Sequence, residues 1–134
     1  MTYCNRAWFD ISGHRVVEDY KDICWQDALT DEGNATSAVQ FDLMVNHKQA
    51  TTFQFQVQRT WSNEQGGEGE AWCLTSAYPE IDEDGTVIGV AGSLTDISEL
   101  KWAESVQRQR IEEAIEAKRQ QDNFIDVRDG IHCM

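Results

Sequence analysis

The stretch from Gly92 to Glu104, GSLTDISELKWAE, changes from strand-like to helix-like sequence within a few residues. Its first half ends a run of small and β-branched residues. Its second half begins a polar segment that has no Gly or Pro up to about Phe124. Glu, Lys, Gln, Arg and Ala dominate that segment, which predicts a helix. At about 1.5 Å rise per residue the helix would be on the order of 40 Å long. The fold must therefore connect a strand to a long helix with almost no linker.

The residues before this stretch predict three consecutive antiparallel strands. Residues 52–61 alternate between apolar and polar side chains, with Arg59 interrupting the apolar face, and this alternation is typical of a half-buried strand. A second strand over 70–80 is expected to end at Pro79 and an acidic Asp-Gly turn, which is a strong hairpin signal. Residues 86–95 complete the meander.

Two local patterns accompany the predicted switch from strand to helix. Gly89 and Gly92 in the third strand indicate close approach by another backbone or a bend. Asp96, followed three residues later by Glu99, fits the Asp variant of a helix capping box.

The first fifty residues predict helices and irregular chain. After a strand-like piece at the start, Asn5 is a candidate cap for a short helix that Gly13 ends. Residues 14–32 are irregular, with short helices expected in places, and residues 33–48 predict a helix with Asn34 as its candidate cap. The fold class that follows is α+β: an antiparallel sheet with flanking helices, then a long C-terminal helix.

Charge and cysteine usage limit the classes of partner. With 24 acidic and 11 basic residues the formal net charge is −13, which argues against nucleic acid and anionic membrane as partners. No apolar run approaches the roughly 20 residues of a membrane span, and the N-terminus lacks a secretory signal pattern. The four cysteines are scattered and form no CxxC pair. We therefore expect reduced thiols in a cytoplasmic protein, rather than disulfides or a zinc site.

Five short motifs, taken in order, resemble those of a PAS domain with its C-terminal PAC motif. They are YCNRAWFDISG at 3–13, FQFQVQR at 53–59, AWCL at 71–74, DGTVIG at 84–89 and TDISE at 95–99. The resemblance covers residues 3–104 and implies a PAS/PAC domain over 1–97. It also implies that the usual first strand is missing, which would leave one sheet edge unpaired and favour dimerisation or instability.

The C-terminal segment carries a second resemblance. Residues 117–126, AKRQQDNFID, are similar to the start of the dimerisation helix of fungal hybrid histidine kinases. This implies a signalling helix or coiled-coil linker over 98–126 and a divergent tail over 127–134, where the phosphoacceptor box would stand. His132 is off register and lacks the neighbours of that box, so we do not expect it to accept a phosphoryl group.

Two groups of candidate site residues follow from these resemblances. The relay from sheet to helix is expected at Thr95, Asp96, Ile97 and Glu99. Apolar side chains could line a ligand cavity behind the sheet, or could simply fill a core. These are Trp8, Phe9, Trp25, Phe41, Met44, Phe53, Phe55, Trp72 and Leu74.

The function that the resemblance implies is a sensory or dimerisation module of a two-component histidine kinase, without the kinase core. No hydrolase, P-loop or zinc-protease motif is present, so this chain alone is not expected to be an enzyme. No cofactor is expected, and His47 is expected to be solvated rather than a haem ligand. The partner expected is a second copy, through the C-terminal helix or the sheet, with a small-molecule ligand as a further candidate. A single frayed helix, a haem or flavin sensor and a purely structural interaction module remain alternatives.

Overall fold

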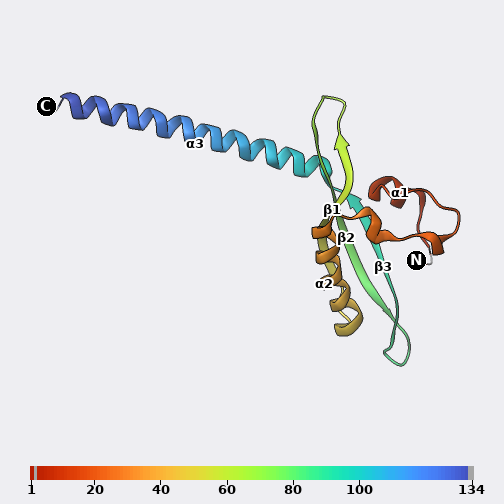
Figure 1. Ribbon diagram of the computed structural model, residues 1–134. Helices are drawn as coiled ribbons and strands as arrows, with labels where there is room; N and C mark the ends of the chain where they lie inside the picture. Colours follow the sequence, from red (N-terminus) through yellow and green to blue (C-terminus); the bar gives the residue numbers. More distant parts are fainter. Residues whose placement is uncertain (2, 133–134) are drawn as a thin grey trace. The chain divides into compact units, whose positions relative to one another are not determined.

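The computed structural model describes residue 1 and residues 3–132, with side chains as far as residue 122. The chain divides into two units, Met1–Leu100 and Lys101–Met134. Figure 1 shows the elements, and the fold is the expected α+β arrangement. In chain order they are α1 (Arg6–Ser12), η1 (Tyr20–Asp22), η2 (Trp25–Ala28), α2 (Asp31–His47), β1 (Thr51–Ser62), β2 (Glu68–Ile81), β3 (Val87–Asp96) and α3 (Ser98–His132).

Helix α1 forms where the sequence predicts it. The Asn5 side chain accepts a hydrogen bond from the Trp8 backbone N–H at 3.1 Å, and Gly13 ends the helix with a left-handed φ of 78°. The prediction of a short strand before this helix is wrong. Residues 3 and 4 form no strand and pair with none of the described strands. Cys4 instead packs into an apolar cluster with Phe9 and Ile23.

Helix α2 begins earlier than expected, and its cap is Thr30 rather than Asn34. The Thr30 hydroxyl accepts a hydrogen bond from the Gly33 N–H at 3.1 Å and donates one to the Gln56 carbonyl at 3.2 Å. A Cβ on Gly33 would lie 2.6 Å from the same carbonyl. Glycine therefore lets the first turn of α2 approach β1 closely, while Asn34 donates instead to the Gln26 carbonyl.

The three strands form one antiparallel sheet in the order β1-β2-β3. Phe55 lies opposite Cys73, which lies opposite Asp96. The predicted alternation of β1 is confirmed, and the interruption that Arg59 makes coincides with a register shift between Val57 and Thr60. One face of the sheet carries the core, whose buried members are Ala28, Leu29, Phe55, Val57, Ala71 and Cys73.

Strand β2 continues through Pro79 to Ile81, so the expected end at Pro79 is wrong. The pairing of β1 with β2 begins at Thr51 opposite Ala77, and no residue of β1 stands opposite Pro79. Since the ladder alternates, the missing N–H of Pro79 points toward this unpaired side, where proline is tolerated. The acidic turn is confirmed, with Gly85 at a φ of 81°.

The close approach predicted for the glycines of β3 is present at Gly92 only. A Cβ there would lie 2.6 Å from the Ser76 carbonyl, whereas a Cβ on Gly89 would meet only a Glu80 carboxylate oxygen at 3.8 Å. Helix α3 then begins at Ser98, directly after β3, as the sequence predicts. Its described residues cannot cross a membrane, and neither can those of α2.

Candidate functional site

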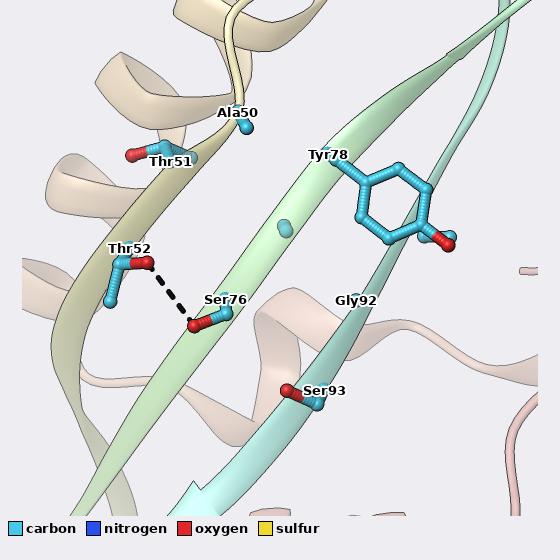
Figure 2. Close-up of a pocket in the computed structure, with 9 residues that line it drawn as sticks. Ala50, Thr51, Thr52, Ser76, Tyr78, Gly92 and Ser93 are labelled. Carbon is cyan, nitrogen blue, oxygen red and sulfur yellow. Dashed lines mark hydrogen bonds between the residues drawn. The ribbon is translucent and has the colours of Figure 1, made fainter.

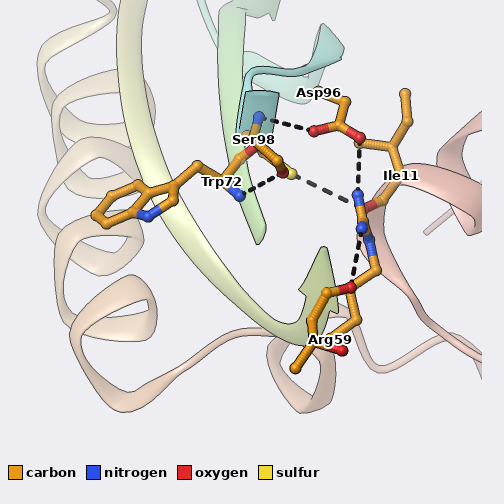
Figure 3. A network of polar contacts seen from close by, with 7 residues as sticks. Ile11, Arg59, Trp72, Asp96 and Ser98 are labelled. Atoms are coloured by element: carbon orange, nitrogen blue, oxygen red, sulfur yellow. Dashed lines mark hydrogen bonds and ion pairs between the residues drawn. The ribbon is translucent and has the colours of Figure 1, made fainter. Parts of the chain in front are cut away.

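The sheet and helix α3 meet in a network of polar contacts, which we call the junction: Arg59, Trp72, Asp96, Ser98 and the Ile11 carbonyl. Figure 3 shows Asp96 joined by dashed lines to Ser98 and to Arg59. One carboxylate oxygen accepts a hydrogen bond from the Arg59 guanidinium at 2.9 Å, and the other accepts the Ser98 backbone N–H at 2.9 Å. A single side chain at the end of β3 therefore connects the far strand of the sheet to the first residue of α3.

Ser98 ties the start of the helix to the central strand. Its side chain is fully buried. Its hydroxyl oxygen accepts the Trp72 backbone N–H at 2.9 Å and lies 3.4 Å from the Trp72 carbonyl, to which the hydroxyl donates. The same carbonyl accepts the Ile97 N–H at 2.9 Å. The serine side chain thus continues the ladder between β2 and β3 after the backbone has turned into a helix.

Arg59 connects the junction to helix α1. Its Nε donates to the Ile11 carbonyl at 2.8 Å, one of the carbonyls left over at a helix C-terminus. A Cβ on Gly13 would lie 3.0 Å from the Arg59 side chain, so glycine leaves room for it. The sequence marked Arg59 only as an interruption of an apolar face. A single positive charge on an otherwise apolar strand face indicates that an acidic partner lies nearby, and this was the signal in the sequence for the pairing with Asp96.

The charges of the junction affect two titratable groups. Burial acts to raise the pKa of Asp96, but hydrogen bonds from Ser98 and Arg59 and the guanidinium charge outweigh it, so the pKa lies below its ordinary value. Burial, with the Asp96 charge adding to it, raises the pKa of the Cys73 thiol to about 11. Cys73 is therefore a neutral thiol packed against the junction, not a nucleophile.

The four predicted relay residues have different positions. Asp96 belongs to the junction, and Ile97, which is buried, donates its N–H to the Trp72 carbonyl beside it. Thr95 pairs with Leu74 in the ladder and is exposed. Glu99 is exposed too. A capping box would use the N–H of Glu99, but Asp96 instead accepts the N–H of Ser98, two residues on. That part of the prediction is wrong: α3 begins at Ser98, so Asp96 lies one residue before the capping position, and its carboxylate binds the N–H of Ser98 instead.

The predicted cavity residues are distributed over several packing groups. Trp8 and Phe9 contact each other edge to face and join the cluster around Ile23. Trp25 stacks on Phe41, with ring centroids 5.9 Å apart.

Four of the other predicted cavity residues divide between the two faces of the sheet, and one lies on α2. Phe53 and Phe55 belong to the core face, and Met44 is buried on α2. Trp72 and Leu74 alternate with the buried Cys73 along β2, so they lie on the opposite face and are half-buried.

A shallow open pocket of about 590 Å³ lies at the other end of the sheet, and Figure 2 shows it. Nine residues line it, mostly small or hydroxyl-bearing: one directly before β1 and the others from β1, β2 and β3. They are Ala50, Thr51, Thr52, Ser76, Ala77, Tyr78, Ala91, Gly92 and Ser93. None of the nine predicted cavity residues is among them. The hydroxyls of Thr52 and Ser76 lie 3.1 Å apart and hydrogen bond, and Tyr78 is about half exposed.

Other candidate ligands do not converge in the described part of the chain. No group of three His, Cys, Asp or Glu side chains there could hold a metal ion. Cys4, Cys24 and Cys73 are free thiols. His47 is exposed, and its Nε2 lies 3.8 Å from the Oδ2 of Asp42. His132 and Cys133 lie outside the residues whose side chains are described.

Comparison with known proteins gives a family match and two structural matches. The family model described as PAS fold matches residues 1–101. A sensory box histidine kinase/response regulator from Burkholderia thailandensis E264 aligns with a TM-score of 0.51 and 14% identity. That alignment covers 67% of this chain and 64% of the other, just under two thirds.

A light-oxygen-voltage domain, solved in a study of a flavin analogue, gives the same TM-score and identity. It covers 83% of this chain and 77% of the other. At this identity both structures show likeness of fold alone. No curated protein gives a significant match.

Proposed function

This chain belongs to the PAS fold family, and we propose that it is a sensory input module which relays a signal from its sheet through the junction into helix α3. The proposal rests on the way in which α3 begins. Every polar contact described at its first residue comes from the sheet: Asp96 from β3 and the backbone of Trp72 from β2. No loop separates β3 from α3 that could absorb a movement.

The relay works by displacement of a strand rather than by chemistry. A ligand or partner that changes the packing behind the sheet shifts β2 and β3 together, because they form one ladder. Ile97 and Ser98 are bonded to Trp72 of that ladder, so the start of α3 follows. Helix α1 is coupled to this movement as well, because Arg59 donates a hydrogen bond to the Ile11 carbonyl at its C-terminal end. Small shifts of packed elements of this kind are a known means of switching.

The output that we propose is a two-component histidine kinase, with this chain providing the input and not the kinase core. The sensory box named in one structural neighbour supports this, as does the similarity of residues 117–126 to a dimerisation helix. Side chains on α3 suit pairing with a second copy: Ile111 and Ile115 are 53% and 55% exposed. Isolated polar helices are only marginally stable in water.

The test places residues 1–126 upstream of the dimerisation and catalytic parts of a well-behaved histidine kinase. Autophosphorylation is compared between the parent fusion, Asp96→Ala and Arg59→Gln. Asp84→Ala, a change to another acidic residue in the exposed hairpin turn, is the matched control. We expect the two junction variants to change the kinase rate several-fold and the control to leave it unchanged. Parent-like rates in both junction variants, with the fusion still folded, would contradict the relay.

A cofactor-binding sensor is the alternative, favoured by the structural likeness to a light-oxygen-voltage domain. The absorption spectrum of the purified chain separates the two proposals. A Soret or flavin band, retained through gel filtration and removed by denaturation, would support the alternative. A colourless protein that still passes the kinase test would support the relay without a cofactor.

A further inference from the structure

Two hydrogen bonds of opposite polarity hold the ring of His14, which follows α1 directly after Gly13. Its Nε2 accepts the Cys24 backbone N–H at 3.3 Å, and its Nδ1 lies 2.7 Å from the carbonyl oxygen of Arg15. A backbone N–H only donates, and a carbonyl oxygen only accepts. The two bonds can therefore coexist only in the neutral ring that carries its one proton on Nδ1.

The bond to Cys24 closes residues 15–23 into a loop, which we call the clamped loop. Hydrogen bonds within this loop are local, in η1 and its caps. Its apolar side chains pack toward α1, where Ile23 is buried in one cluster with Phe9. The polar contact at His14 thus links the far end of the loop to the residues that end α1.

The rings beside His14 are uncharged. From α1 it faces Trp8 and Phe9, whose ring centroids lie 5.6 and 6.2 Å away. From β1, Arg59 lies against Gly13, but its guanidinium is bound to Asp96. No ion pair of the described residues includes His14. The charged side chains of α1 and of the clamped loop are all exposed: Arg6, Asp10, Arg15, Glu18, Asp19, Lys21 and Asp22. The Cys24 thiol points to the Gln26 side chain, to whose oxygen it donates at 3.6 Å.

A second proton on the ring is incompatible with this arrangement. It would turn Nε2 from an acceptor into a donor that faces the Cys24 N–H, so the bond between them would be lost. The backbone of His14 would stay in place, because its N–H bonds to the hydroxyl of the buried Ser12 at 3.2 Å. We propose that His14 is a proton-sensitive clamp: the neutral ring holds the clamped loop on α1, and the charged ring releases it.

Acidification should therefore open the clamped loop. Histidine is the side chain that ordinarily changes charge between about pH 5 and pH 8. The bond to Cys24 should be present toward the upper end of this range and lost toward the lower end. Opening would uncover the apolar cluster that contains Phe9 and Ile23. This inference goes beyond the relay and does not depend on it, because the loop can be observed in the chain itself.

Nitrogen-15 NMR of the histidine rings in the unaltered full chain, at about pH 8, tests the tautomer, and it does not depend on a variant folding. The spectrum of His14→Gln serves only to identify the signals of this residue. We expect a single tautomer with the proton on Nδ1, because only this form makes both bonds. A ring that carries its proton on Nε2, or that exchanges freely between the two forms, would overturn the proposal.

Amide exchange at Cys24 tests the release, with protection expressed relative to the unfolded chain at each pH. Loss of one hydrogen bond should lower the protection by about three- to tenfold between about pH 8 and pH 5. His14→Gln should remove this dependence on pH, because its amide oxygen can accept the N–H and does not titrate. The matched control is His47→Gln, a change at an exposed histidine, which should behave like the parent. Protection in the parent that is independent of pH, or that falls equally in His14→Gln, would overturn the proposal.

Discussion

The two ends of the sheet are built from the same three strands and differ in almost every other respect. At the junction end Val57, Ala71, Cys73 and Ser98 are at most 1% exposed, and the carboxylate of Asp96 is bound on both oxygens. At the other end, which we call the open end, Thr52, Ser76 and Ser93 are exposed around a shallow pocket. The sheet is therefore closely packed where α3 begins and loosely packed where a ligand could approach. The difference predicts that equivalent substitutions have unequal effects.

The largest effect is expected for a larger side chain in the core face of β2. Ala71 is completely buried, so Ala71→Leu should lower the free energy of unfolding by about 1–3 kcal/mol through overpacking. Ala77→Leu, six residues along the same strand and on the same face, should change it by less than about 0.5 kcal/mol, because Gly92 opposite has no side chain. Urea unfolding measures both. Equal losses would show that the two ends are packed alike.

Loss of the Ser98 hydroxyl should have the next largest effect. Ser98→Ala removes the oxygen that accepts the Trp72 N–H, and the loss of such a hydrogen bond costs about 1 kcal/mol. Ser93→Ala, an exposed serine on the neighbouring strand, is the matched control and should be almost neutral. Amide exchange at Trp72 provides a local measurement, since its protection should fall in Ser98→Ala alone. Unchanged protection there would argue against Ser98 as a member of the ladder.

A smaller effect, dependent on pH, is expected from Asp96. Its pKa is lower in the folded chain than in the unfolded chain. The carboxylate therefore stabilises the fold fully above the unfolded value of about 3.9, and this contribution disappears as pH falls through the folded pKa. The contribution should stay below about 1 kcal/mol, because the Asp96 and Arg59 side chains are 37% and 23% exposed. The stability difference between wild type and Asp96→Asn should shrink below about pH 4; a difference that is constant with pH would exclude this carboxylate as its source.

Much of this fold could be predicted from local sequence, because its signals are local. Alternation identifies β1, the Asp-Gly turn identifies the hairpin of β2 and β3, and the absence of Gly and Pro identifies the described part of α3. The errors arise where a distant partner decides the outcome. Thr30 rather than Asn34 caps α2, since the Thr30 hydroxyl also reaches a carbonyl of β1, and no pattern within the helix indicates that contact.

Only part of the junction could be predicted, again because distant partners decide which residues belong to it. Asp96 could be identified from its place before a helix, but Ser98 could not, because an exposed and a buried serine look alike in sequence. Arg59 became meaningful only when the register of β1 brought it to Asp96, which is 37 residues away in the chain. The predicted set of cavity residues was partly wrong for a similar reason. Hydrophobicity alone does not tell which face of β2 a residue lies on, and Trp72 and Leu74 lie on the face opposite the core.

The smallest change in the free energy of unfolding is expected at the open end. Its size tests whether the two ends of the sheet differ in how firmly they are held. Ser76→Ala removes the hydrogen bond between the hydroxyls of Ser76 and Thr52, whose length is 3.1 Å. Both residues are exposed, so water replaces the lost partner, and the free energy of unfolding should change by less than about 0.5 kcal/mol. The same chemical change is then nearly neutral at one end of β2 and costly at the Ser98 contact with the other end. A loss above about 1 kcal/mol in Ser76→Ala would mean that the pocket end is held as firmly as the junction. In that case a ligand entering the pocket would have to break existing order before it could move the strands.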